Sequence, residues 1–245
     1  MSINNPLFER SHILIGDEGI ARLEASHVLV AGIGGVGSYT AEALARLGVG
    51  QLTLVDHDVV SPSNLNRQLI ALNSTVNRLK ISVMAERIKD INPTCRVTVL
   101  NQFLSPESIP PLLEKPFDAV IDAIDSMSSK AALIETAWHR DITLFSSMGA
   151  GGKLDPTQIR TGDLMDTTIC KLAKQLRRHV RKRDVGRGIQ TVYSIEPSIE
   201  PLPPQAVARG RPRAVNGTVS YMPSLFGLTL AGLAANALIG DARRG

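Results

Sequence analysis

Two patterns of apolar residues alternate along the first 150 residues of the chain. Short runs rich in β-branched residues predict buried strands, and longer segments with apolar positions three or four residues apart predict helices. The predicted strands cover residues 27–31, 51–56, 96–100, 119–123 and 142–147, and the predicted helices cover residues 36–47, 76–91, 106–115 and 128–139. This alternation predicts the α/β class: a Rossmann-like, doubly wound, mostly parallel sheet with helices on both faces.

The remainder of the chain has a different pattern. It predicts antiparallel strands over residues 158–161, 191–196 and 218–222, a basic helix over 167–183, and a proline-rich loop over 197–212. An uncharged segment at 224–240 follows Pro223 and is shorter than the roughly 20 apolar residues of a membrane span, so it predicts a buried helix on the sheet. We therefore expect a Rossmann-like core over residues 1–150 and a C-terminal elaboration of the same domain over 151–245.

The composition favours a folded intracellular protein. The chain has 245 residues, of which 43% are hydrophobic and 20% charged, which argues against disorder. Cys95 and Cys170 lie far apart and form no C-x-x-C pair, so we expect no disulfide framework and a reducing compartment. The N-terminal residues do not resemble a signal peptide. These features predict a cytoplasmic protein that does not enter a membrane.

A glycine-rich segment follows the first predicted strand and opens the first predicted helix. Gly32, Gly34 and Gly37 have G-x-G-x-x-G spacing, and Gly35 lies among them. The first glycine permits a tight turn, the second lets the backbone approach a phosphate, and the third lets the helix pack closely on the strand. The N-terminus of the helix then offers unpaired N–H groups to an anion. The motif predicts a nucleotide site without saying which nucleotide.

Charged and polar residues follow near the ends of the second and fourth predicted strands. They are Asp56, Asp58, Asn64, Arg67, Gln68, Lys80 and Asp125. Asp56 alone would suit the ribose of NAD, so an NAD(P)-dependent dehydrogenase is one interpretation. A dehydrogenase, however, does not need Arg67, Lys80 and a further acid around its pyrophosphate. A triphosphate does, because the two cations can neutralise its oxygens and Asp125 can hold the bridging Mg²⁺.

These motifs resemble the ubiquitin-activating-enzyme-like superfamily, which includes ThiF, MoeB and HesA. The resemblance is carried, in this order, by Gly32-Ile33-Gly34-Gly35-Val36-Gly37, Asp56-His57-Asp58, Asn64-Leu65-Asn66-Arg67-Gln68, Lys80 and Asp122-Ala123-Ile124-Asp125-Ser126. It implies a homodimeric, ATP-dependent enzyme that binds ATP and Mg²⁺, adenylates a carboxylate and releases pyrophosphate.

The resemblance also implies roles for individual residues. Asp56 would bind the ribose, Arg67 and Lys80 the phosphates, and Asp125 the metal, while Asn64 and Gln68 would complete the polar wall of the nucleotide site. Arg10 is similar to the N-terminal arginine of the family, which reaches into the ATP site of the neighbouring subunit. The candidate catalytic residues are therefore Arg67, Lys80, Asp125 and Arg10.

The predicted basic helix is the main source of uneven charge. Between Lys171 and Arg187 there are eight Lys or Arg residues and one acid, and four of the basic residues share one helix face: Lys174, Arg177, Arg178 and Arg181. Such a face is either solvated or a contact surface for a nucleic-acid backbone. Three further arginines in the later loop favour the second interpretation: Arg209, Arg211 and Arg213.

Three features indicate a branch of the superfamily. The zinc-binding C-x-x-C pairs typical of members that activate sulfur carriers are absent, while the turn at 149–152, Asp155-Pro156-Thr157 and the arginine-rich insertion resemble the branch that acts on modified tRNA. That resemblance implies ATP-dependent activation of the threonyl carboxylate of threonylcarbamoyladenosine in tRNA, followed by dehydration and ring closure. Adenylation of a ubiquitin-like sulfur carrier, docking of a sulfur-transfer protein and a non-catalytic ATP-gated scaffold stay open. Cys170 has either a packing role or a reactive thiol.

Overall fold

The computed structural model describes residues 5–205 and 213–242 of the chain. Within them, seven strands form one sheet in the order β3-β2-β1-β4-β5-β7-β6. The strands are β1 (His27–Ala31), β2 (Gln51–Asp56), β3 (Arg96–Asn101), β4 (Ala119–Asp122), β5 (Leu144–Ser147), β6 (Ile159–Asp163) and β7 (Gln190–Ser194). Neighbouring strands are parallel except β6 and β7, which are antiparallel. The predicted doubly wound fold class is confirmed.

Helices cover both faces of the sheet. One face carries α1 (Glu9–Ala25), α2 (Gly37–Leu47), α3 (Lys80–Ile91) and α7 (Tyr221–Ile239), and the other carries α4 (Ile109–Leu112), α5 (Met127–His139) and α6 (Lys171–Arg181). Strand β1 shows the two-sided burial: Val28 and Val30 join one core cluster, and Leu29 and Ala31 join the other. All four are fully buried. A strand that is buried on both sides has a continuous run of apolar residues, and this run allowed β1 to be predicted from the sequence.

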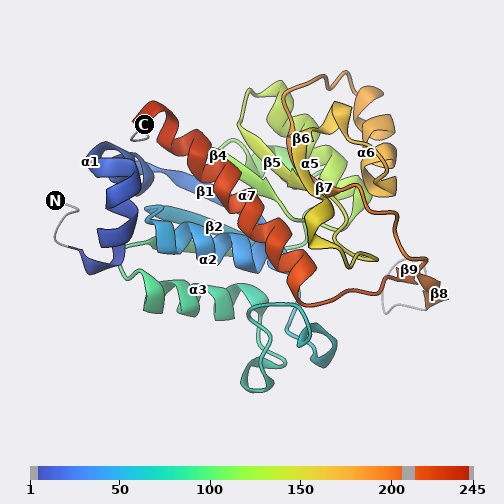
Figure 1. Cartoon of the computed structure of the whole chain (residues 1–245), viewed down its shortest axis with the longest axis horizontal. Helices are drawn as coiled ribbons and strands as arrows, with labels where there is room; N and C mark the ends of the chain where they lie inside the picture. Colours follow the sequence, from blue (N-terminus) through green and yellow to red (C-terminus); the bar gives the residue numbers. More distant parts are fainter. Residues whose placement is uncertain (1–4, 206–212, 243–245) are drawn as a thin grey trace.

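Helix α7 is long and apolar, and it packs on the sheet with about half of its residues buried. Its length and hydropathy would also suit a membrane span. It crosses the face of the sheet beside α2 (Figure 1) and contributes Met222, Phe226 and Leu230 to the core. The Thr40 hydroxyl donates to the Gly227 carbonyl at 2.9 Å, so α2 and α7 are in direct contact. The predicted buried helix is confirmed, although it begins at Tyr221; proline is tolerated in the first turn of a helix, so Pro223 does not prevent this start.

Several boundaries differ from the prediction for local reasons. The helix predicted from residue 76 begins at Lys80, because Asn73–Thr75 forms a 3₁₀ turn and Asn77 has a φ of 68°. The helix predicted over 106–115 shortens to Ile109–Leu112. Residues 218–222, predicted as a strand, form a loop and the start of α7. The other 3₁₀ turns are Pro6–Phe8, Pro62–Asn64, Pro156–Gln158, Leu164–Asp166 and Gly240–Ala242.

Pairing in the C-terminal part also differs from the prediction. Strand β7 was expected to be antiparallel, yet it pairs in parallel with β5 and extends the main sheet; only β6 runs against it. Strand β8 (Leu202–Gln205), within the proline-rich segment, pairs antiparallel with β9 (Arg213–Val215), which follows that segment. Helix α1 was not predicted, and its helical path is interrupted at Gly16, where φ is 64°. Strand partners and a kinked helix depend on tertiary contacts that local periodicity does not encode.

Candidate functional site

The glycine turn lies against the segment that follows β4. Gly32 ends β1 with a φ of 90°, and its amide donates to the Val55 carbonyl of β2 at 2.8 Å. A Cβ on Gly32 would lie 2.7 Å from the Ala123 carbonyl oxygen, so the turn and the 123–126 segment are in contact. These segments meet at the carboxyl ends of β1 and β4, where the strand order reverses. Such a switch point is where doubly wound sheets bind ligands.

Gly37 is required by packing within the fold, whereas Gly34 faces the cavity. A Cβ on Gly37 would lie 1.8 Å from the Gly32 carbonyl oxygen, so α2 packs directly on the turn. A Cβ on Gly34 would meet nothing nearer than the Gln68 amide nitrogen at 3.7 Å. The fold therefore has space for a side chain at position 34, but that space belongs to the cavity. Gly37 serves packing, and Gly34 keeps the backbone open to a ligand.

We expect Gly37→Ala to destabilise the protein and Gly34→Ala to leave its stability nearly unchanged. The added methyl at position 37 must push backbone apart, which costs about 1–3 kcal/mol. At position 34 the free energy of unfolding should change by less than about 0.5 kcal/mol, while nucleotide affinity falls about tenfold or more because backbone donors lose their approach to the phosphates. Urea unfolding and ATP titration measure the two effects. Unchanged ATP affinity in Gly34→Ala would remove that residue from the binding surface.

One cavity of about 810 Å³ collects most of the residues that the sequence singled out. Its lining includes Gly32, Gly34, Gly35, Asp56, Asp58, Asn64, Arg67, Gln68, Lys80 and Asp125. Gly37 lies behind the turn, and Arg10 lies in α1, which is at the opposite end of the molecule from β8 and β9 (Figure 1). A volume of this size suits a small-molecule ligand.

The acids that follow β2 organise the cavity through hydrogen bonds. One Asp56 oxygen accepts from the Ile33 amide at 2.7 Å and the other from the Asp58 amide at 2.8 Å, so this carboxylate fixes the glycine turn. Asp58 pairs with the buried Lys80 ammonium at 2.7 Å. Asp56, His57 and Asp58 place two carboxylates and an imidazole close enough to approach one cation, but the carboxylates of Asp56 and Asp58 already accept the hydrogen bonds described here. The Lys80 side chain is thereby held at the cavity wall.

Two side chains after β2 present groups that a ligand can use. The Arg67 guanidinium donates to the Ser63 carbonyl at 2.8 Å and to the Asn66 side-chain oxygen at 2.9 Å, and burial lowers the pKa of Arg67. Its partners are neutral, so an anion would offset the cost of burying the charge. The Gln68 side-chain oxygen is buried and has no hydrogen-bond partner within the described ranges. A ligand hydroxyl could donate to it, which fits a nucleotide ribose.

Asp125 offers a carboxylate to the cavity from the segment that contacts the glycine turn. It follows β4, and its side chain is exposed. Mg²⁺ is commonly held by one or two carboxylates together with substrate phosphates, so this donor set fits the metal. Asp125 would be the protein ligand, and the metal would supply charge neutralisation at the phosphate oxygens.

Sequence reasoning missed a buried ion pair behind this carboxylate. Lys130 and Asp122 are 1% and 0% exposed, and their charged atoms are 2.7 Å apart. Lys130 also donates to the Ser147 carbonyl at 2.9 Å, and the Ser146 hydroxyl donates to Asp122 at 2.6 Å. The pair therefore joins the carboxyl ends of β4 and β5. The only sequence signal was a lysine on the apolar face of α5.

An apolar wall was also missed. Phe103 lines the cavity just after β3, is 50% exposed, and meets His57 edge-to-face with ring centroids 5.0 Å apart. Gln102 and Leu104 line the same wall. A half-exposed aromatic ring beside a polar pocket suits a planar base. Its position at the end of a predicted strand was the available signal.

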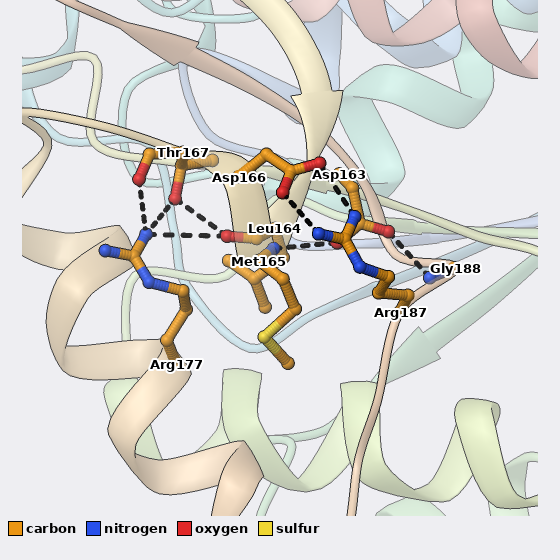
Figure 2. Close-up of polar contacts among 8 residues, drawn as sticks. All are labelled: Asp163, Leu164, Met165, Asp166, Thr167, Arg177, Arg187 and Gly188. Atoms are coloured by element: carbon orange, nitrogen blue, oxygen red, sulfur yellow. Dashed lines mark hydrogen bonds and ion pairs between the residues drawn. The ribbon is translucent and has the colours of Figure 1, made fainter.

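The basic helix uses one of its four predicted contact residues inside the fold. Figure 2 shows Arg177 and Arg187 approaching the turn at 163–167 from opposite sides. Arg177 donates to the Thr167 carbonyl at 2.8 Å, and Arg187 makes two bonds to Asp166 at 2.8 and 2.7 Å. Three basic residues of α6 stay exposed on the predicted face: Lys174, Arg178 and Arg181. Arg209 and Arg211 lie outside the described residues, and the side chain of Arg213 is not described.

The two cysteines are buried. Cys95 belongs to the core beside β3, and burial raises its pKa to about 11. Cys170 is 5% exposed, precedes α6 and packs in the other core cluster while touching the cavity. The packing interpretation of Cys170 agrees with this burial.

The fold and the cavity define an α/β protein with an anion-binding glycine turn at the switch point of its sheet. The chain belongs to the ThiF family, whose model matches residues 8–244. This confirms the resemblance seen in the motifs.

Relatives and solved structures agree with the family. A tRNA threonylcarbamoyladenosine dehydratase from Bacillus subtilis is 45% identical over 192 residues, which are 78% of this chain and 76% of the relative. The structure of Escherichia coli TcdA, tRNA N6-threonylcarbamoyladenosine dehydratase, in complex with ATP has a TM-score of 0.84 at 37% identity and covers 94% of this chain and 93% of that chain. A molybdopterin-synthase adenylyltransferase from Haemophilus influenzae is 31% identical over 164 residues, 66% of each chain.

Proposed function

We propose that this protein is an ATP-dependent tRNA threonylcarbamoyladenosine dehydratase of the cytoplasm. It would adenylate the threonyl carboxylate of threonylcarbamoyladenosine in tRNA and so drive loss of water and ring closure. The observation that carries the proposal is one cavity that unites the glycine turn, two cations and Asp125, and that reaches the first residues of the basic helix α6. The dehydratase relatives at about 45% identity support the choice of substrate.

The chemistry needs cations more than a protein nucleophile. The substrate carboxylate attacks the α-phosphorus, and pyrophosphate departs with the electrons of the broken P–O bond. Arg67 and Lys80 would neutralise the phosphate oxygens while Asp125 holds Mg²⁺. Asp56 would bind the ribose, with Asn64 and Gln68 beside it. The ordered hydrogen bonds of Asp56 and Lys80 support this, because preorganised groups need no rearrangement during the reaction.

We assign Arg10 to the site of a second subunit. In its own chain Arg10 is exposed on α1 and does not line the cavity. Ile13 and Leu14, one turn further on, are 59% and 70% exposed, which supports a covered face in a homodimer. Analytical ultracentrifugation tests this, and a stable, fully active monomer would contradict it.

The exposed basic face of α6 would bind the tRNA backbone. We expect replacement of Lys174, Arg178 and Arg181 by glutamine to weaken tRNA binding and to reduce the slope of log affinity against log salt by about 0.7–0.9 for each phosphate that is no longer neutralised. Titrations between 50 and 200 mM salt measure the slope. Lys89→Gln on α3, an exposed lysine on the opposite face of the sheet, is the control. An unchanged slope in the triple variant would show that this face is solvated and does not contact tRNA phosphates.

The direct test is incubation with ATP and tRNA that carries threonylcarbamoyladenosine, followed by nucleoside mass analysis. We expect AMP, pyrophosphate and a nucleoside lighter by one water. The second candidate is adenylation of a ubiquitin-like sulfur carrier, which the molybdopterin-synthase adenylyltransferase relative favours. If a carrier with a diglycine end stimulates pyrophosphate exchange and modified tRNA does not, the tRNA proposal fails. If AMP forms neither with modified tRNA nor with the carrier protein, the scaffold interpretation is favoured.

A further inference from the structure

The cavity extends past the nucleotide residues to the start of α6. We call this part the annex; it is lined by residues 148–151 after β5 and by Cys170, Lys171 and Leu172. In the sheet, β5 lies two strands away from β1, with β4 between them. Strands are about 4.8 Å apart, so the annex lies roughly 10 Å from the glycine turn. The order across the cavity is therefore glycine turn, Asp125 segment, annex.

Packing fixes the first turn of α6 at the annex. A Cβ on Gly149 would lie 3.8 Å from a methyl of Leu172, which is ordinary contact. Cys170 and Ala173 are buried in the core beneath, so the helix start is anchored. Lys171 is exposed and lines the cavity. The backbone thus holds this lysine at the cavity rim.

The Lys171 side chain differs from the other cations of the cavity in having no partner among the residues that the structure describes. Lys80 pairs with Asp58, and Arg67 is bonded to two neutral oxygens. The neighbouring Lys153 is buried and donates to the Glu196 carbonyl. The Lys171 ammonium makes no hydrogen bond or ion pair with any residue of the ranges 5–205 and 213–242. Its charge is available to a ligand.

We propose that Lys171 binds the substrate carboxylate and holds it in the annex for attack on the α-phosphorus. This inference rests on the proposed function. The carboxylate must approach a nucleotide of the same sign, so a cation away from the phosphate turn offsets the repulsion. A carboxylate oxygen forms the new bond to phosphorus, the bond to pyrophosphate breaks, and the electron pair leaves with pyrophosphate. No proton is transferred in this step.

The position of Lys171 on α6 connects the annex to the tRNA face. Lys171, Lys174 and Arg178 are spaced at i, i+3 and i+7, so they share one side of the helix. At 1.5 Å per residue the stripe to Arg181 extends about 15 Å. A tRNA backbone bound along this stripe would place one nucleoside at the N-terminal end of α6. Lys171 would then bind the carboxylate of the modified nucleoside, whereas Lys174 would contact only the phosphate backbone.

The test uses two tRNAs of one sequence, with and without the threonylcarbamoyl group, bound in the presence of a non-hydrolysable ATP analogue. Wild-type protein should prefer the modified tRNA. Lys171→Gln should weaken binding of the modified tRNA by about ten- to a hundredfold and leave unmodified tRNA unchanged, because it removes a single charged hydrogen bond. Lys171→Arg should keep most of the preference. Lys174→Gln should weaken both tRNAs equally.

Three results would overturn the inference. Lys171→Gln could weaken both tRNAs equally, which would make Lys171 a backbone contact. It could weaken binding of the ATP analogue, which would assign the lysine to the phosphates. It could change nothing. If wild-type protein does not distinguish the two tRNAs and forms no AMP with the modified tRNA, the proposed function has failed as well. Failure of the Lys171 role alone would leave AMP formation by the wild-type protein intact.

Discussion

Replacing Asp125 with alanine should abolish Mg²⁺-dependent turnover and leave the fold intact. The carboxylate follows β4 beside the glycine turn and is the proposed protein ligand of the metal. A metal that neutralises developing charge contributes several kcal/mol to the transition state, so we expect the rate to fall about a thousandfold or more. The side chain is exposed, so the free energy of unfolding should change by less than about 0.5 kcal/mol. AMP formation across a Mg²⁺ titration measures the effect.

Asp90→Ala is the matched control for this change. Asp90 is also an exposed acid, lies on α3 and does not line the cavity. It should keep the wild-type rate and the wild-type dependence on Mg²⁺. Asp125→Ala with an unchanged Mg²⁺ dependence would remove Asp125 from the metal role, whatever its rate.

Lys130→Met should destabilise the protein more than any surface change. It would leave the Asp122 carboxylate buried without its cation, and breaking a buried pair in this way costs about 3–5 kcal/mol. For a protein of this size the melting temperature should fall by about 2–4 °C for each kcal/mol. Urea unfolding followed by circular dichroism gives the free energy directly.

A double-mutant cycle separates the ion pair from the loss of lysine packing. Asp122→Asn removes the charge and keeps an oxygen that can accept from the Ile124 amide. The double variant Lys130→Met, Asp122→Asn should therefore be less destabilised than the sum of the single changes. Additive effects, or a cost below about 1 kcal/mol for Lys130→Met, would show that the pair is not coupled as described.

The sequence predicted which residues line one cavity better than it predicted the pairing of the strands. The glycine turn, Asp56 and Asp125 each follow a predicted parallel strand, and parallel strands bring their carboxyl ends together. Lys80, the first residue of α3, was singled out by its charge and its place in the motif order. Strand β7 was recognised as a strand, but its parallel pairing with β5 depends on residues far away in the chain. Local periodicity carries no such information.

The missed parts of the site have physical explanations of the same kind. Lys130 looks like an ordinary helical lysine until β4 and β5 bring Asp122 and Ser147 to it. Arg177 shares a helical face with Lys174 and Arg178, yet the fold bends the turn at 163–167 onto its guanidinium. The annex joins residues after β5 with the start of α6, and only the folded chain places them together.

The position of α7 has a consequence for synthesis of the protein. This helix covers apolar residues of α2 and of the central strands, and it is the last long element among the described residues. All seven strands of the sheet precede α7 in the chain, so during synthesis they can pair before α7 is present. The apolar residues that α7 covers are exposed during that time, and exposed apolar surface of this kind promotes aggregation until α7 packs on the sheet.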